Sequence, residues 1–420
     1  MASRYGGAVK DERRRDLLLT AAIFGGMVLA LLVGFLARQS EGVMAVLPAF
    51  TWFGSLFKQL LLVIIYPLVL ASMVVGVVNL GDVRKVGRLA TAGLAWFFTT
   101  TGLAVVLGIV MVNVFKPGEG VDLALAEETP AHLAERGFGE FFLEMLKNTF
   151  KNPFDSLAGG DVLAIIAFGL LLGAVTSTLG DQGKPVAEFF RSLNTVMMKL
   201  TDWVMYLAPV GVFALLTEVI AQQGFDAVTA LASYCGVVVG ALLIHGVLVL
   251  PLLGWALGGM PPWTFFAGIR KALMVAFSTA SSAATLPITM ECCEEQLGVE
   301  PKVARFVLPL GATVNMDGTA LYESVAAIFI AQVYGIELDL GQQVLVFITA
   351  TTAAVGAAGI PGAGLITMTL VLTAVGLPIE GIGLILAVDR LLDMVRTTVN
   401  VAGDATGAVV VNRWFASRSG

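Results

Sequence analysis

Ionisable side chains recur at helical spacing inside an apolar segment near the end of the chain. The polar positions are Asp389, Asp393, Arg396, Thr397, Asn400 and Asp404. At about 100° of rotation per residue, all of them fall within a stripe roughly 100° wide on a helix. Leucine and valine fill most of the positions between them. One strongly polar face therefore runs along an otherwise apolar helix, which a solvent-facing surface does not explain.

Charges in such a helix need partners or a function. A charged side chain near the bilayer midplane costs about 2.5–3.5 kcal/mol even on the mildest scale. Self-neutralising ion pairs that only hold helices together are the structural alternative. Arg396 offers a planar fork that suits a carboxylate, and Asp393, one turn earlier, can accept an ammonium group. Together they suit a zwitterion that carries an additional acid.

A second polar run lies at residues 311–323. Asn315, Thr319 and Glu323 are four residues apart and share a helix face. Asp317 lies about 200° from Asn315 around a regular helix and would point the opposite way. Either the helix unwinds at Gly318, or Asp317 serves a second site behind the first.

An unwound turn would free carbonyl oxygens for a hard cation, and Asp317 and Asp404 would add negative charge. Sodium suits ligation by oxygen alone. The threonines at 99–101 could add hydroxyl oxygens near Asp317. The alternative for these threonines is a hydrogen bond back to their own helix.

The composition is that of a membrane protein. Of the 420 residues, 57% are hydrophobic and 13% are charged, too few to cover a soluble domain. Several apolar stretches exceed the roughly 20 residues that cross a bilayer. These stretches begin near 17–37, 57–80, 92–115, 162–179, 196–220, 227–258, 303–333, 343–376 and 380–412.

The distribution of charge predicts an orientation. Lys and Arg cluster at 4–15 and 84–88, whereas the 118–136 loop is acidic. We therefore expect both termini to be cytoplasmic, with an even number of crossings and a retained first helix rather than a signal peptide. The three cysteines form no disulfide framework or metal motif.

Two apolar segments of the C-terminal part are interrupted by small residues, at 281–287 and at 356–362. Each break leaves halves too short to span, so each segment is expected to be a re-entrant helical hairpin. Irregular backbone at membrane depth needs protein or a watery cavity as a partner, and paired breaks indicate a transport site. Close helix packing by small residues is the alternative reading.

Four motifs carry a resemblance to a known family. They are Ser282–Pro287, Asn315–Thr319, Gly359–Gly364 and the pair Asp393 and Asp404. In this order they resemble the glutamate transporter family, the dicarboxylate/amino-acid:cation symporters that include the excitatory amino acid transporters, and the similarity covers nearly the whole chain. The resemblance implies an all-α polytopic membrane protein with eight transmembrane helices, two re-entrant helical hairpins, inverted repeats and an elevator-type fold.

The resemblance also implies a division of the chain. The segments would be 1–80 (scaffold helices 1 and 2), 81–115 (helix 3, transport domain), 116–225 (helices 4 and 5, scaffold and trimerisation), 226–260 (helix 6), 261–300 (hairpin 1), 301–336 (helix 7), 340–377 (hairpin 2) and 378–420 (helix 8). The protein would be a homotrimer in the lipid of a bacterial inner membrane, with no nucleic-acid partner and no organic cofactor.

Site roles follow from the resemblance by position. Arg396 would bind the side-chain carboxylate of the substrate and Asp393 its amino group. The rest of the pocket would be Ala280, Ser281, Ser282, Thr319, Ile360, Gly364, Thr397 and Asn400. A first sodium ion would use Gly311, Asn315, Asn400 and Asp404, a second Thr313, Met316, Ala354, Val355 and Ala357, and a third Thr100, Thr101, Asn315 and Asp317. Glu323 matches a position where proton-coupled members have a protonatable glutamate.

These residues favour aspartate or glutamate as the substrate. Relatives that carry dicarboxylates lack the acid at 393, and neutral amino-acid exchangers lack the arginine at 396. The second arginine that family members place in hairpin 1 or after the eighth-helix aspartate is missing, because Ala280 and Met394 occupy those positions. Potassium counter-transport is therefore left open.

Three other functions remain as alternatives. The first is a C4-dicarboxylate symporter of the same fold. The second is an ion channel lined by the hairpins, although conduction does not require the zwitterion-shaped pair in the last helix. The third is an intramembrane hydrolase that uses Asp317 and Asp404, although His132 and His245 have no evident serine partner.

Overall fold

The computed structural model is helical throughout the part that it describes, residues 2–40, 47–79, 83–120, 147, 151–159, 162–356 and 362–416. No strand occurs within these ranges. The helices are α1 (Ala2–Gln39), α3 (Leu47–Asn79), α4 (Val83–Phe115), α6 (Pro153–Gly159), α7 (Val162–Thr178), η2 (Gly180–Gly183), α8 (Lys184–Met205), α9 (Ala208–Gln223), α10 (Phe225–Leu243), η3 (Ile244–Val249), α11 (Leu250–Gly258), α12 (Pro262–Thr279), α13 (Ser282–Glu291), η4 (Cys292–Gln296), α14 (Pro301–Val314), α15 (Asp317–Val333), α16 (Leu340–Gly356), α17 (Ala363–Ala374), η5 (Ile379–Gly381) and α18 (Ile382–Ala416).

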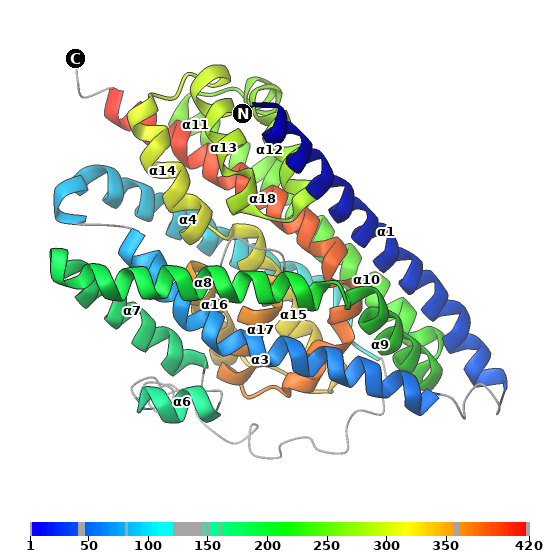
Figure 1. Cartoon of the computed structure of the whole chain (residues 1–420). Coiled ribbons are helices and arrows are strands. Elements are labelled where there is room, and N and C mark those ends of the chain that lie inside the picture. Colours follow the sequence, from blue (N-terminus) through cyan, green and yellow to red (C-terminus); the bar gives the residue numbers. More distant parts are fainter. Residues whose placement is uncertain are drawn as a thin grey trace.

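One group of helices forms the periphery of the molecule. Helix α1 packs on α9, and α3 packs on α7, α8 and α9. In Figure 1, α3 and α8 cross the front of the molecule and α1 lies along its right side. Large apolar side chains remain exposed on these helices, including Leu32 (60%), Val63 (66%) and Trp203 (62%). Exposed apolar surface of this extent is expected of a protein whose surroundings are lipid.

The second group surrounds helix α18. This helix contacts α10, α11, α12, α14 and α15, and α15 in turn packs closely on α4. Nearly every residue of α15 is buried. The start of α1 and the end of α18 both lie at the upper end of the molecule in Figure 1. The polar residues of α15 and α18 are therefore enclosed by other helices.

Two pairs of helices lie at the interruptions that the sequence predicts. The first interruption is shorter than predicted: the chain leaves the helix only at Ala280 and Ser281, and residues 282–287 belong to α13. Helices α12 and α13 contact each other, as do α16 and α17. Between α12 and α13 the backbone of Ala280 takes a left-handed conformation with φ 51°, which costs a non-glycine residue about 1–3 kcal/mol. The Ser281 side chain then accepts a hydrogen bond from the backbone N–H of Ala284 at 3.2 Å and caps α13. Residues 357–361, between α16 and α17, lie outside the described residues.

The break in the seventh predicted helix differs from the expectation. The chain leaves the helix at Asn315 (φ −92°, ψ 94°) and Met316 (φ −121°, ψ 51°), between α14 and α15. Unwinding at Gly318 was one of the two alternatives that the sequence left open, but Gly318 is in the first turn of α15. Its backbone N–H is bound by the side chain of Asn400 at 2.8 Å. Backbone N–H groups in the first turn of a helix have no acceptor within the helix. The Asn400 side chain supplies the acceptor for Gly318.

By length and composition, three helical stretches of the described chain could cross a membrane: Ala21–Gln39, Thr91–Phe115 and Val228–Gly258. The helices Gly180–Met205 and Ala208–Gln222, bent by 57°, would form a fourth span together. The expected total of eight crossings stays a prediction. The other helices that could cross a membrane are short or broken, or they carry the charged residues described below.

Gly318 allows α15 to approach the backbone of α18. A Cβ atom at this position would lie 2.5 Å from the carbonyl oxygen of Arg396. We expect Gly318→Ala to separate the two helices and to destabilise the fold by about 1–3 kcal/mol, as overpacking does. The measurement is the apparent unfolding temperature of purified protein in detergent. Gly383→Ala on α18 is the matched control, since a Cβ atom there would meet nothing within 4 Å; equal unfolding temperatures for the two variants would contradict the prediction.

Candidate functional site

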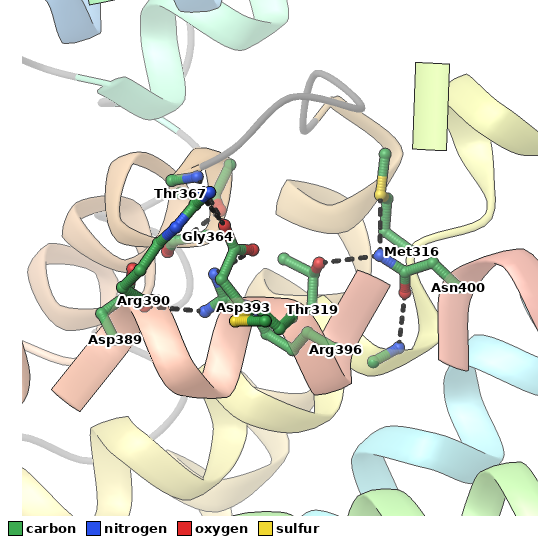
Figure 2. A network of polar contacts seen from close by, with 12 residues as sticks. Met316, Thr319, Gly364, Thr367, Asp389, Arg390, Asp393, Arg396 and Asn400 are labelled. Carbon is green, nitrogen blue, oxygen red and sulfur yellow. Dashed lines mark hydrogen bonds and ion pairs between the residues drawn. The ribbon is translucent and has the colours of Figure 1, made fainter. Parts of the chain in front are cut away.

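The side chain of Arg396 is the centre of a buried charge cluster on α18. It has no exposed surface. Its Nη2 donates to Asp393 Oδ1 at 2.7 Å and its Nη1 donates to Asp389 Oδ1 at 3.0 Å (Figure 2). Both carboxylates are also buried. One guanidinium therefore binds two acids from the same helix, while its Nε has no hydrogen-bond partner within the described chain.

Two other helices close around this guanidinium. The ring of Tyr322 on α15 lies under it, with 4.0 Å between the guanidinium carbon and the ring centroid, which is a favourable cation–π distance. At the start of α17, Gly364 is so close that a Cβ atom there would lie 2.7 Å from Arg396 Nη1. A larger residue here would require the Arg396 side chain to shift.

The second oxygen of Asp393 faces hairpin residues and another arginine. Its Oδ2 accepts a hydrogen bond from the backbone N–H of Gly362 at 2.8 Å. It also lies 3.9 Å from Nη1 of Arg390, which is 8% exposed. Sequence reasoning missed Arg390, although a signal was present: it lies about 60° from Asp393 around the helix, at the edge of the polar stripe.

Asn400 connects α18 to the start of α15. Besides binding the N–H of Gly318 through Oδ1, its Nδ2 donates to Thr319 Oγ1 at 3.2 Å and to Met316 Sδ at 3.3 Å (Figure 2). All the polar groups of the Asn400 side chain are thus used to position the broken helix. The predicted pocket residues Thr319 and Asn400 are brought together.

Asn315, in the break itself, contacts a carboxylate, a backbone carbonyl and a hydroxyl group. Its Nδ2 donates to Asp404 Oδ1 at 2.9 Å and to the carbonyl of Asn400 at 3.3 Å. On the other side, Thr100 Oγ1 lies 3.5 Å from Asn315 Oδ1. Gly311 is adjacent, since a Cβ atom there would lie 2.5 Å from Asp404 Oδ1. The four residues predicted for the first sodium ion therefore lie together.

Asp317 is buried behind this cluster, and both of its carboxylate oxygens have polar partners. Its Oδ1 accepts from Thr101 at 2.6 Å and from Thr100 at 3.2 Å. Its Oδ2 lies 3.1 Å from Nε2 of His245. Thr99, in contrast, is exposed and donates to the carbonyl of Ala95 on its own helix at 2.7 Å. Thr100 Oγ1 also lies 3.2 Å from the carbonyl of Phe97 on its own helix. Both readings of the threonine run therefore apply, and Thr100 shows both of them.

His245 is a second residue that sequence reasoning missed as a site component. It has no exposed surface and lies in η3, a π-helical turn between α10 and α11. Such turns often occur at functional sites. The contact brings Nε2 of the imidazole within hydrogen-bonding distance of Asp317 Oδ2. The sequence feature that could have indicated this role was the occurrence of one histidine within a long apolar segment.

Glu323 is buried on α15 and receives a hydrogen bond at Oε1 from Thr367 Oγ1 on α17. Its Oε2 is also buried and has no hydrogen-bond partner within the described chain. A carboxyl group that carries a proton fits this environment better than an anion, because an unpaired buried charge is strongly unfavourable. The contact joins the seventh predicted helix to the second hairpin.

Several predicted residues are not brought into these clusters. Thr313 donates to the carbonyls of Leu310 and Pro309 on its own helix, at 2.9 and 3.4 Å. Ala354 is buried on α16, and Thr397 is buried on α18. The roles expected of Val355, whose side chain is not described, and of Ala357 and Ile360, which lie outside the described residues, stay predictions. Ala280 and Ser281 occupy the turn before α13, and Ser282 is the first residue of this helix, which packs against α18.

Comparison of the sequence with known proteins identifies a family that this chain matches. A family model described as the sodium:dicarboxylate symporter family matches residues 19–414. The human excitatory amino acid transporter 2 is 38% identical, over 96% of this chain and 79% of its own length. Excitatory amino acid transporter 1 of Ambystoma tigrinum (95% and 83%) and an excitatory amino acid transporter of Caenorhabditis elegans (95% and 88%) are also 38% identical.

Proposed function

The chain belongs to the sodium:dicarboxylate symporter family, and on this premise we propose that it couples sodium entry to the uptake of an acidic amino acid, aspartate or glutamate. Its relatives are transporters and not enzymes. The observation that carries the proposal is the buried Arg396, held between two carboxylates beside a hairpin. Such a cluster is suited to exchanging its internal partners for those of a zwitterion.

The substrate would bind by exchange of ion pairs. Its side-chain carboxylate would take one arm of the Arg396 fork, and its ammonium group would take Asp393. Asp389 would remain bound to the other arm of the fork. Because the charges are enclosed, an exchange in which Asp393 gains the ammonium group as it leaves Arg396 avoids leaving a bare charge in the interior. The presence of Asp393 favours an amino acid over the alternative C4-dicarboxylate substrate, which has no ammonium group.

Sodium ions are cargo in this proposal. The oxygen-rich cluster around Asn315 offers carboxylate, amide, hydroxyl and carbonyl groups from α4, α14, α15 and α18. Hard cations prefer such oxygen donors. One ion would be held by Asp404 with Asn315 and Asn400, and another by Asp317 with the hydroxyls of α4. The site that sodium would take at hairpin 2 rests on the resemblance alone.

This geometry disfavours the other classes of function. In a hydrolase, Asp317 and Asp404 would act as a pair, but Asn315 lies between them and Asp317 is bound to two threonines and a histidine. In a channel, ions would have to pass between α15 and α18. Asn400 links these two helices directly by hydrogen bonds. A transporter that moves the cluster together with its cargo requires no such opening.

The proposed movement is that of an elevator in a homotrimer. Helices α4 and α10 to α18, which surround the site, would form the moving unit, and α1, α3 and α7 to α9 would form the scaffold at 1–80 and 116–225. The packing of each group mainly within itself supports this division. The protein is a multi-pass membrane protein, and we place it in a bacterial inner membrane with both ends of the chain in the cytoplasm.

Coupling to protons is a further part of the proposal. Glu323 lies between α15 and α17, so its protonation would affect how the second hairpin packs over the site. A neutral carboxyl group would cross the membrane with the moving unit more easily than an anion.

Purified protein in liposomes should accumulate labelled aspartate when sodium is high outside and low inside. The expected result is uptake above the equilibrium level that disappears when sodium is replaced by choline. Uptake that does not depend on sodium would reject the coupling, and flux only down the aspartate gradient would favour a channel.

Replacement of Arg396 by cysteine removes the group that would bind the substrate side chain. We expect Arg396→Cys to weaken aspartate binding by about 100-fold or more, as truncation of one partner of a buried charge pair does, and to admit neutral amino acids. Competition for sodium-dependent uptake measures both effects. Arg413→Cys, near the exposed end of the same helix, is the control; an Arg396→Cys protein with wild-type aspartate affinity would contradict the assignment.

Glu323→Gln keeps the shape of the side chain and removes its titration. Sodium-driven uptake should persist in this variant, whereas its dependence on external pH and on an imposed proton gradient should be lost. Uptake into liposomes over a series of pH values measures this. Ser324→Ala, which alters the next buried residue, should keep the wild-type pH dependence. If Glu323→Gln also kept it, Glu323 would not carry the proton.

A further inference from the structure

Thr367 is a buried residue of the second hairpin that connects two parts of the site. It lies on α17 and is 2% exposed. Its Oγ1 is hydrogen-bonded to Oε1 of Glu323 on α15, and it also lies 3.4 Å from the carbonyl oxygen of Gly364, one turn earlier on its own helix (Figure 2). Gly364 is the residue that lies directly against the guanidinium of Arg396. Thr367 therefore lies between a titratable group and the turn of α17 that faces the arginine.

The hydrogen bond between Glu323 and Thr367 can run in either direction. An ionised carboxylate can only accept, so Thr367 then donates its single hydroxyl proton to Glu323. A protonated carboxyl group can instead donate to Thr367, whose own proton is then available to a backbone carbonyl of α17, such as that of Gly364. The other oxygen of Glu323, Oε2, is buried without a hydrogen-bond partner in the described chain, so a proton is better placed on Oε1, where it has an acceptor. The protonation state of Glu323 thus decides which acceptor the Thr367 hydroxyl uses.

The surroundings of Glu323 contain few other groups that could respond to its proton. Of the helices that pack on α15, α16 and α17 contain no charged residue, and the charged residues of α4 lie in its first two turns. Helix α10 contributes the phenol of Tyr234, which stacks on Phe329 of α15, and its one charged residue lies in its first turn. Helix α18 contributes the charge of Arg396, which two carboxylates of the same helix already neutralise. Thr367 is therefore the group that responds most directly.

We infer that Thr367 is a positioning residue through which the proton on Glu323 fixes the first turn of α17 beside Arg396. The inference rests on the proposed function and deepens the part of it that concerns protons. When Glu323 is neutral, the Thr367 hydroxyl holds the carbonyl of Gly364 and with it the backbone next to the arginine. When Glu323 is ionised, the hydroxyl turns to the carboxylate, and this turn of α17 loses that contact. Aspartate is therefore expected to bind more tightly at low pH than at high pH, by a factor that depends on the Thr367 hydroxyl.

The test compares variants of Thr367 at a series of pH values. Thr367→Val and Thr367→Ala both lack the hydroxyl, and valine keeps the shape of the side chain. Thr367→Ser retains the hydroxyl. Thr373→Val on the same helix is the matched control, because the Thr373 hydroxyl donates to the backbone carbonyl of Thr369 at 2.7 Å. Aspartate affinity at saturating sodium is measured by calorimetry on purified protein, and sodium-driven uptake is measured in liposomes.

The wild-type protein should bind aspartate more tightly as the pH falls, and Glu323→Gln should show no such change. In Thr367→Val and Thr367→Ala, the ratio of the affinities at low and high pH should fall by about fivefold or more, the lower end of the usual coupling between two sites. Thr367→Ser and Thr373→Val should keep the wild-type ratio. A loss of packing alone would weaken binding by the same factor at every pH, so this ratio separates a positioning role from a structural one.

Three results would overturn the inference. A wild-type ratio in both variants without the hydroxyl would show that Thr367 does not transmit the protonation state. Loss of the ratio in Thr367→Ser as well would show that the hydroxyl is not the group responsible. A wild-type affinity that does not change with pH, or one that still changes in Glu323→Gln, would show that a proton on Glu323 does not act on binding. Sodium-driven aspartate uptake by the wild-type protein in any of these cases would leave the proposed function standing, whereas its absence would reject that function itself.

Discussion

The charge of Arg396 is enclosed by protein, and the structure depends on neutralising that charge inside the molecule. In a low-dielectric interior an unpaired guanidinium costs several kcal/mol, so carboxylates must approach within hydrogen-bonding distance. Asp389 and Asp393 do so from the same helix. The ring of Tyr322 and the close approach of Gly364 exclude water from the remaining sides. The result is a cluster that is stable in itself and can also exchange partners.

The break between α14 and α15 links this cluster to a second one. Asn315 leaves the helix and reaches Asp404, while Asp317 begins the next helix and faces the hydroxyls of α4. Asn400 lies between the clusters and binds residues of both sides of the break. The proposed substrate and cation sites therefore share side chains, so occupancy of one site can affect the geometry of the other. Coupled transport requires a dependence of this kind.

Three differences between expectation and structure have physical reasons. The helix breaks at Asn315 rather than at Gly318, because Asn400 supplies a partner for the freed N–H of Gly318 and so lets the helix start earlier. Arg390 was overlooked because helical spacing places it at the edge of the polar stripe, and its relation to Asp393 depends on side-chain length. His245 was overlooked because an isolated histidine in an apolar helix gives no indication of its partner, Asp317.

The sequence by itself determined the membrane class, the polar faces of the last two long helices, the broken segments and the family. These features are local: helical periodicity and apolar length can be read within one segment. Only the tertiary structure decided which polar groups meet. Thr101 and His245 reach the same carboxylate, that of Asp317, from positions 216 and 72 residues away, and hydrogen bonds require their atoms to come within about 3 Å of it. No pattern along the chain encodes that distance, because it depends on how several helices pack at once.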